Sequence, residues 1–283
     1  MDLQKITAIV MLVSLMLGAG LEINREHLMA ALRDFGLLAR AFLASFIIVP
    51  ILGVILVRLF HLEGDIAVGF LLMAIAAGVP FLVRAAGRES GGSLGFAAAL
   101  AFILPAVSII TIPVTARLVL PPDAQAHVPA VQLVITLVIF QLVPLLIGML
   151  LADRAPALAG KLQRPMMLVF LISLVGLLVI LGPALIKAIT SVYGSRGMLA
   201  MLVIVALSAA AGWLLGGPAP QNRRTLAIAT ALRNIGTCSV IATASFRDTL
   251  VGPTVLVYLL VQIVVTVIIR VVSGRRAAPA ASA

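Results

Sequence analysis

Long runs of apolar residues, separated by short polar connections, dominate the pattern along this chain. Nine of these runs approach the roughly 20 residues that an α-helix needs to cross the hydrocarbon core of a bilayer. They predict spans over residues 6–21, 36–59, 66–87, 94–118, 131–151, 166–189, 198–215, 225–248 and 252–272. The expected fold class is therefore an all-α polytopic membrane protein, a single domain over residues 1–283.

Two of the nine segments are interrupted near their middle. The third contains Gly78-Val79-Pro80, and the eighth contains Arg233-Asn234-Ile235-Gly236. The N–H and C=O groups that such a break frees must face protein or a cavity, because lipid offers them no partner. Corresponding breaks in two halves of a chain indicate a transporter whose site lies at the bilayer midplane.

The order of the segments predicts two inverted repeats, about 1–122 and about 123–276, with the first helix of the first repeat missing. The longest polar connection, residues 153–164, is the expected hinge between the two halves. Residues 277–283 are expected to form a disordered tail.

Composition excludes a soluble globular protein. Hydrophobic residues make up 63% of the chain, charged residues 11%, and the mean hydropathy is +1.24. The net charge of +10 comes from basic residues that lie mostly between the apolar runs, which indicates membrane orientation and not nucleic-acid binding. One cysteine, Cys238, excludes an internal disulfide and a cysteine metal cluster.

The basic residues predict the orientation in the cell membrane. Thirteen fall on one side of the predicted spans: Arg25, Arg33, Arg40, Arg84, Arg88, Arg154, Lys161, Arg164, Arg223, Arg224, Arg270, Arg275 and Arg276. Six fall on the other: Lys5, Arg58, Arg117, Lys187, Arg196 and Arg247. The positive-inside rule therefore places the C-terminus in the cytoplasm and the N-terminus outside.

The strongest candidate for a binding residue is Arg233, which remains within the membrane. An arginine at bilayer depth costs between ~2.5 and more than 10 kcal/mol, so it is expected to face protein, water or a ligand. Its guanidinium offers a forked pair of donors to a carboxylate or sulfonate. The alternative is an arginine that snorkels to the membrane surface.

Five further residues complete the predicted substrate-binding set: Asn234, Gly236, Thr237, Ser239 and Arg84. Each also has a structural interpretation. Asn234 is a potential helix cap, Gly236 a backbone requirement, and the two hydroxyls potential donors to their own helix. Arg84 is otherwise an ordinary cation of the cytoplasmic side.

Four stretches together resemble the bile acid:sodium symporter family, within a wider group that includes arsenite permeases and auxin-type efflux carriers. They are Met16-Leu17-Gly18-Ala19-Gly20-Leu21, Ala76-Ala77-Gly78-Val79-Pro80, Ile109-Ile110-Thr111-Ile112-Pro113 and Leu232-Arg233-Asn234-Ile235-Gly236. The resemblance implies a panel domain beside a core domain, with substrate and ions bound where the two broken helices cross.

The chain departs from this family at the positions implied for sodium ligands. Sodium-coupled members would have a glutamate at Ala229, a glutamine at Arg233, a supporting glutamine at Ser45 and an asparagine near Arg84. The residues present supply few oxygen ligands, and the two arginines repel a cation. Sodium is therefore not expected as a cofactor, and no other cofactor or metal is expected.

These observations favour a secondary transporter of a small organic anion that works by alternating access. The alternative is a sodium-coupled organic-anion symporter with shifted ligands. A membrane-embedded sensor or enzyme is disfavoured, because the ten acidic residues lie outside or at the ends of the apolar runs and provide no base or metal site. The expected partners are the anion and the lipid bilayer, without nucleic acid.

Overall fold

The computed structural model describes residues 2–88 and 91–275, and the predicted tail at 277–283 lies outside them. Helices are the only regular elements of the described residues, which contain no strand. In chain order they are α1 (Leu3–Glu22), α2 (Arg25–Ala31), α3 (Phe35–Phe42), η1 (Leu43–Ile48), α4 (Val49–Leu59), α5 (Gly64–Ile75), η2 (Val83–Arg88), α6 (Leu94–Val119), α7 (Pro122–Ala126), α8 (Ala130–Leu137), η3 (Val138–Leu142), α9 (Val143–Arg154), α10 (Pro156–Ile180), α11 (Gly182–Gly194), α12 (Gly197–Leu215), α13 (Pro220–Ala231), α14 (Ile235–Ser245) and α15 (Val251–Arg275). The elements η1, η2 and η3 are π-helical turns.

Seven helical stretches among the described residues are long and apolar enough to cross a membrane. They are Leu3–Glu22, Phe35–Leu59, Leu94–Val119, Ala130–Arg154, Pro156–Ile180, Gly197–Leu215 and Pro220–Ser245. The other two predicted segments correspond to shorter apolar helices, Gly64–Ile75 and Val251–Val265. The prediction of a multi-pass, all-α membrane protein is thus confirmed.

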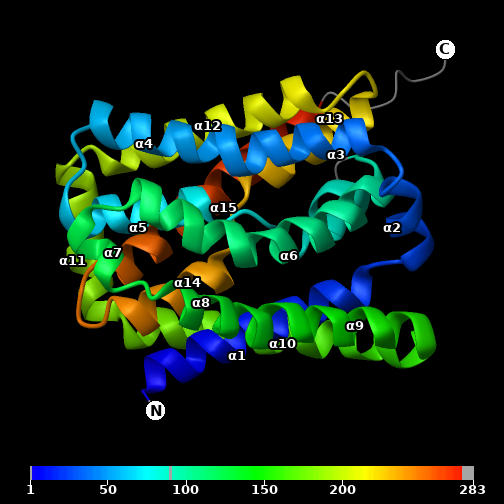
Figure 1. The fold of residues 1–283 in the computed structure, drawn as a ribbon, viewed down its shortest axis with the longest axis horizontal. Helices are drawn as coiled ribbons and strands as arrows, with labels where there is room; N and C mark the ends of the chain where they lie inside the picture. Colours follow the sequence, from blue (N-terminus) through cyan, green and yellow to red (C-terminus); the bar gives the residue numbers. More distant parts are fainter. Residues whose placement is uncertain (1, 89–90, 276–283) are drawn as a thin grey trace.

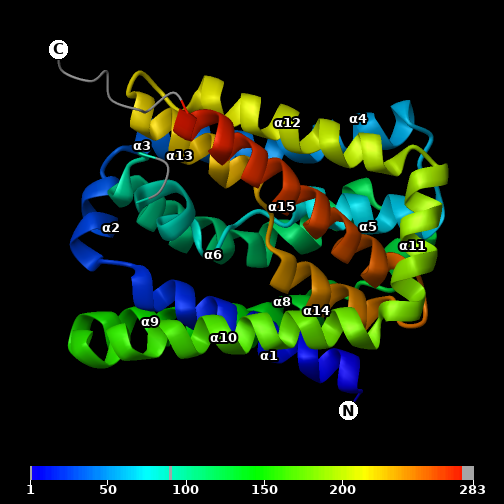
Figure 2. The same cartoon turned by 180° about the vertical axis from the view of Figure 1, so that it is seen from behind.

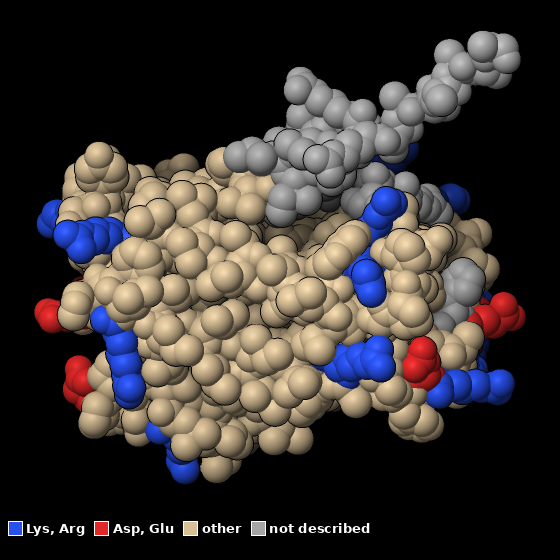
Figure 3. Space-filling model, turned by 90° about the horizontal axis from the view of Figure 1, so that it is seen from above, with Lys and Arg blue, Asp and Glu red and all other residues tan. Residues whose placement is uncertain are grey.

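The surface suits a lipid environment. Lysine, arginine, aspartate and glutamate gather toward two opposite ends of the molecule and leave a broad band of other residues between them (Figure 3). Large apolar side chains stay exposed along the spans, among them Ile110, Ile135 and Ile172. Such a surface is unfavourable in water and favourable against lipid tails.

Three spans form a layer of their own: α1, the continuous run α8–η3–α9, and α10. We call it the three-helix layer and all other elements the main body. Helix α1 packs against both α9 and α10, and the layer lies along the bottom of Figure 1 and Figure 2. In the main body, α3, α4, α12 and α13 lie farthest from the layer, α5, α6 and α14 lie between, and α15 runs obliquely from the far row toward the layer (Figures 1 and 2).

Proline explains two of the π-helical turns. The turn η1 directly precedes Val49-Pro50, and η3 directly precedes Val143-Pro144. A proline ring lacks an N–H and clashes with the carbonyl four residues earlier, and a wider turn relieves both problems without ending the span. Each turn also carries one fully buried polar side chain, Ser45 in η1 and Gln141 in η3.

The predicted hinge and the sixth span are wrong in their boundaries. Residues 156–164 belong to helix α10, and Ala155 alone separates this helix from α9. Lys161 and Arg164 are exposed, so the helix continues with its polar residues at the surface. The predicted span 166–189 is divided instead at Leu181, because Pro183 fits the first turn of a new helix but not the interior of an existing one.

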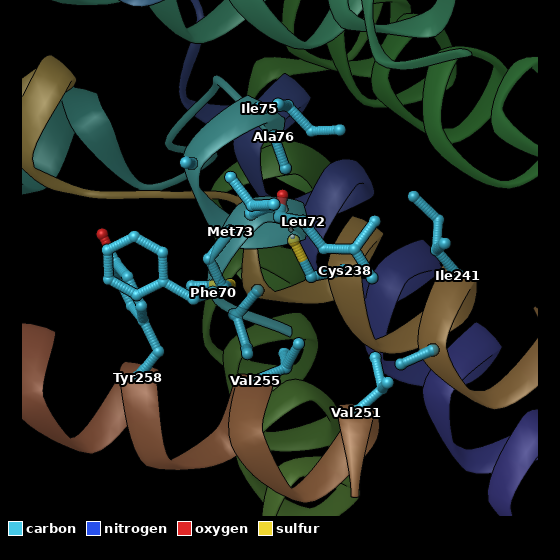
Figure 4. Packing of buried hydrophobic residues seen from close by; sticks show 14 of the residues in the cluster. Phe70, Leu72, Met73, Ile75, Ala76, Cys238, Ile241, Val251, Val255 and Tyr258 are labelled. Carbon is cyan, nitrogen blue, oxygen red and sulfur yellow. Dashed lines mark hydrogen bonds between the residues drawn. The ribbon is translucent and has the colours of Figure 1, made fainter. Parts of the chain in front are cut away.

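The interior of the main body is packed around the break in the third span. Phe70, Leu72 and Met73 of α5 meet Val255 and Tyr258 of α15 in one buried cluster (Figure 4). The thiol of Cys238 lies in this cluster, 3.4 Å from the carbonyl oxygen of Leu72. Cys238 thus behaves as a small buried residue of the core.

Candidate functional site

The two broken helices meet where each is unwound. Helix α5 ends at Ile75 and α13 ends at Ala231, and α14 resumes at Ile235. The backbone N–H of Asn234 donates to the carbonyl oxygen of Ala76 at 3.1 Å, which joins one break directly to the other. The sequence predicted both breaks, and the structure brings them into contact.

Gly78 explains the path of the first break. Its φ of +121° is open to glycine and rare for L side chains. A Cβ at this position would also lie 3.0 Å from the ring of Pro105 in α6. The chain therefore passes close to α6 at the point where α5 unwinds.

Asn234 caps the resumed helix and also reaches the three-helix layer. Its Oδ1 accepts a hydrogen bond of 3.2 Å from the N–H of Thr237, as expected for an N-cap. Its Nδ2 lies 3.4 Å from Oε1 of Gln141 in η3. Asn234 is thus the helix cap that the sequence offered as its structural interpretation, and its Nδ2 also faces the boundary between the layer and the main body.

Gln141 is the residue that the sequence analysis missed. Its Nε2 donates to the carbonyl oxygen of Pro105 at 2.6 Å and to Oγ of Ser108 at 3.0 Å, both in α6. Its Oε1 accepts from Asn234 and from Oγ1 of Thr237. One fully buried amide therefore joins the three-helix layer to both α6 and the second break. The available signal was an amide three residues before an intramembrane proline.

Arg233 points in another direction, into the main body. Its backbone N–H donates to Oε1 of Gln262 in α15 at 2.9 Å, and its Nη1 lies 3.5 Å from the carbonyl oxygen of Ser45 in η1. The residue is only 1% exposed, so the snorkelling interpretation is wrong. Its Nε and Nη2 have no hydrogen-bond partner among the described residues.

Arg233 forms no ion pair with a carboxylate in the part of the chain that the structure describes. Its contact with Ser45 joins two of the positions at which the resemblance implies sodium ligands. Ala229, the position implied for a glutamate, lies one helical turn earlier and is 1% exposed. The described residues also contain no group of three or more His, Cys, Asp or Glu side chains that could hold a metal ion.

The other predicted residues of α14 line its first turns. Gly236 packs against α1 so closely that a Cβ would lie 3.0 Å from Cδ1 of Leu12. Ser239 is 2% exposed, and its Oγ has no hydrogen-bond partner among the described residues. The N-terminal part of α14 therefore contributes to the boundary with the three-helix layer.

Arg84 lies apart from this cluster. It forms an ion pair with Glu22 at the end of α1, and its side chain is 41% exposed. Together with Gln163 of α10 it lines a surface pocket between the layer and the main body. No hydrogen bond or ion pair of the described residues joins Arg84 to Arg233 or Asn234.

Comparison with known proteins places these features in a family. Residues 9–195 match the model of the Sodium Bile acid symporter family, a stretch that covers about two thirds of the chain and includes the first break and Gln141. None of the curated proteins with which the chain was compared matches it. The second break lies beyond the matched residues, and it is the contact between Asn234 and Ala76 that ties it to the matched part.

Proposed function

Since the chain belongs to the sodium bile acid symporter family, whose members are transporters, we propose that it carries a small organic anion across the cell membrane by alternating access. The three-helix layer corresponds to the panel domain and the main body to the core domain. The substrate binds at their boundary, beside the crossing of the two breaks. The two inverted repeats predicted from the sequence supply one break each.

The observation that carries this proposal is the uncompensated charge of Arg233. A buried ion costs several kcal/mol unless a partner of opposite charge offsets the loss of water. Arg233 is buried beside the crossing, and no acidic group of the described residues is hydrogen-bonded or ion-paired with it. An anion bound at the adjacent Asn234 and Thr237 would supply the missing charge through the low-dielectric interior.

Arg233 also explains how the site dispenses with sodium. Its guanidinium lies against the carbonyl of Ser45, at a place where the resemblance implies oxygen ligands for a cation. A covalently fixed positive charge there contacts this carbonyl of η1 in the way a bound cation would. Positive N-terminal charge from the dipole of α14 adds to the same field.

A second candidate is a sodium-coupled symporter of the same fold. It is favoured by five buried hydroxyl oxygens that have no hydrogen-bond partner among the described residues, those of Ser45, Thr111, Ser208, Ser239 and Thr254. Oxygen atoms in this state are potential cation ligands. Replacing sodium by potassium at constant ionic strength distinguishes the two candidates.

The test of the proposed site is Arg233→Gln, measured as binding of an organic anion such as benzoate to the purified protein. We expect binding to weaken by about 1.5–3 kcal/mol, the order of the Coulomb attraction between a fixed charge and an anion across the protein interior, while the protein still folds and inserts. Arg233→Lys should restore binding only in part, because lysine keeps the charge without the planar fork. A well-folded Arg233→Gln variant that binds benzoate as tightly as the parent would show that Arg233 is purely structural.

A further inference from the structure

The side chain of Gln141 stands at the boundary that must open for transport. It projects from the three-helix layer, and all four of its hydrogen bonds end on the main body. Two of them arise because Asn234 Nδ2 and Thr237 Oγ1 both donate to the single oxygen Oε1. Gln141 is fully buried, so no water competes for these donors in this arrangement.

Separation of the layer from the main body changes the state of these donors. Asn234 and Thr237 then lose their common acceptor. A polar group left unpaired in a buried site costs the full free energy of its desolvation. The position vacated by Oε1 is then bordered by two converging donors at the start of α14, next in the chain to the buried Arg233. A carboxylate oxygen fits that position, because it accepts two hydrogen bonds and carries negative charge.

We propose that Gln141 is a specificity-determining residue whose amide oxygen occupies the place of the substrate's carboxylate oxygen while the site is empty. This inference rests on the proposed function and identifies the chemical group that the site selects. The ligand must displace the amide oxygen of Gln141 from Asn234 and Thr237. An amine or another pure donor cannot replace it, since both groups that face Oε1 donate.

The alternative is a purely structural amide that holds the layer to the main body. The two roles predict opposite effects of shortening the side chain. Without the competing oxygen, Asn234 and Thr237 are free to receive a carboxylate, and its binding becomes stronger. A purely structural amide would instead be needed to form the site, and its loss would weaken binding or leave it unchanged.

The experiment measures binding of potassium benzoate as a shift of the thermal unfolding temperature with concentration, with benzyl alcohol as the uncharged control. We expect Gln141→Ala to bind benzoate about three- to tenfold more tightly than the parent, the effect of removing one or two competing hydrogen bonds. Gln132→Ala is the matched control, because this glutamine lies in the same span with an exposed side chain, and it should bind as the parent does. Adding Asn234→Ala to Gln141→Ala should abolish the gain.

Gln141→Asn covers the case in which Gln141→Ala does not fold. The amide of asparagine ends one methylene short of Asn234 and Thr237, so this variant must also bind benzoate more tightly than the parent. Benzoate binding that depends on Arg233 but is unchanged or weakened by shortening Gln141 overturns this inference and leaves the proposed function standing. Absence of benzoate binding in the parent and in both Gln141 variants overturns the two together. Tighter binding of benzyl alcohol to the same degree also overturns it, because the gain would then come from added space alone.

Discussion

At the scale of single residues, the central feature is a charge that the fold buries without an acidic partner. Arg233 is among the largest fully buried side chains of the molecule, and two of its nitrogen atoms lack a hydrogen-bond partner among the described residues. Natural proteins retain such a destabilising group where function depends on it. Asn234, its neighbour, has two uses at once, as the cap of α14 and as a donor across the layer boundary.

A stability measurement tests the cost of this arginine. We expect Arg233→Met to raise the free energy of unfolding by about 1–4 kcal/mol, the range found when buried charged groups are replaced by apolar ones of similar volume. Anion binding should be lost at the same time. Arg58→Met is the control, because Arg58 is exposed and its replacement should change stability by no more than about 0.5 kcal/mol. A destabilised Arg233→Met variant would contradict the interpretation of an uncompensated charge.

At the scale of elements, close helix contacts and widened turns determine which groups meet. Helices α1 and α9 approach through two glycines, since a Cβ on Gly20 would lie 2.9 Å from Cα of Gly148. Small residues allow membrane helices to pack this closely and gain van der Waals contact. In the same run of helix, η3 widens before Pro144 and presents Gln141 to the main body.

The glycine contact predicts that Gly20→Ala destabilises the three-helix layer. The added methyl group meets the backbone of α9, which cannot yield as a side chain does, and we expect a loss of about 1–3 kcal/mol in unfolding free energy. Gly160→Ala is the matched control within α10, where a Cβ has no neighbour within 4 Å. It should be neutral or stabilise the helix by about 0.5–1 kcal/mol. Equal thermal unfolding of the two variants would show that the α1–α9 contact is not tight.

At the scale of the whole molecule, ion pairs connect residues that lie at the same end of the membrane spans. At one end, Arg25 of α2 pairs with Asp153 of α9, and Arg84 pairs with Glu22. At the other, Arg247 pairs with Asp2. The first end holds loops that the charge pattern assigns to the cytoplasm, and the second holds loops that it assigns to the exterior.

Orientation is tested with reporters fused to the C-terminus. We expect a fluorescent protein to be active there and alkaline phosphatase to be inactive, because the thirteen basic residues of that side favour the cytoplasm. A fusion after His127, in a loop assigned to the opposite side, should give the reverse pattern. Active alkaline phosphatase at the C-terminus would invert the proposed orientation.

Coupling is tested by exchanging the cation at constant ionic strength. We expect benzoate binding and transport to be the same in sodium, potassium and choline, because Ala229, Ser45 and Arg233 replace the oxygen ligands implied by the resemblance. A lithium salt is a useful additional control for a small-cation effect. Markedly stronger binding in sodium alone would support the second candidate, a sodium-coupled symporter.

The sequence by itself determined the membrane class, seven spans that the structure confirms, and the positions of both breaks. Each of these features depends on local properties: the length of an apolar run against the thickness of a bilayer, and the inability of glycine, proline or a charge to continue a lipid-facing helix. Arg233 was identifiable for the same reason, since a charge at bilayer depth is costly wherever its partners lie. Hydropathy did not predict the boundary between α10 and α11 at Leu181, because the apolar run continues across the change of direction at Pro183.

Only the tertiary structure decided which side chains meet at the crossing. Arg233 and Ser45 are separated by 188 positions, and Thr237 and Gln141 by 96. Hydropathy distinguishes lipid from water, but within a chain that is apolar almost throughout it does not mark the face that another helix covers. The π-helical turns η1 and η3 rotate Ser45 and Gln141 toward the second break, and this rotation depends on how each span accommodates its proline. Arg84, predicted to bind the same anion as Arg233, forms an ion pair with Glu22, because the first break resumes at the surface end of α1.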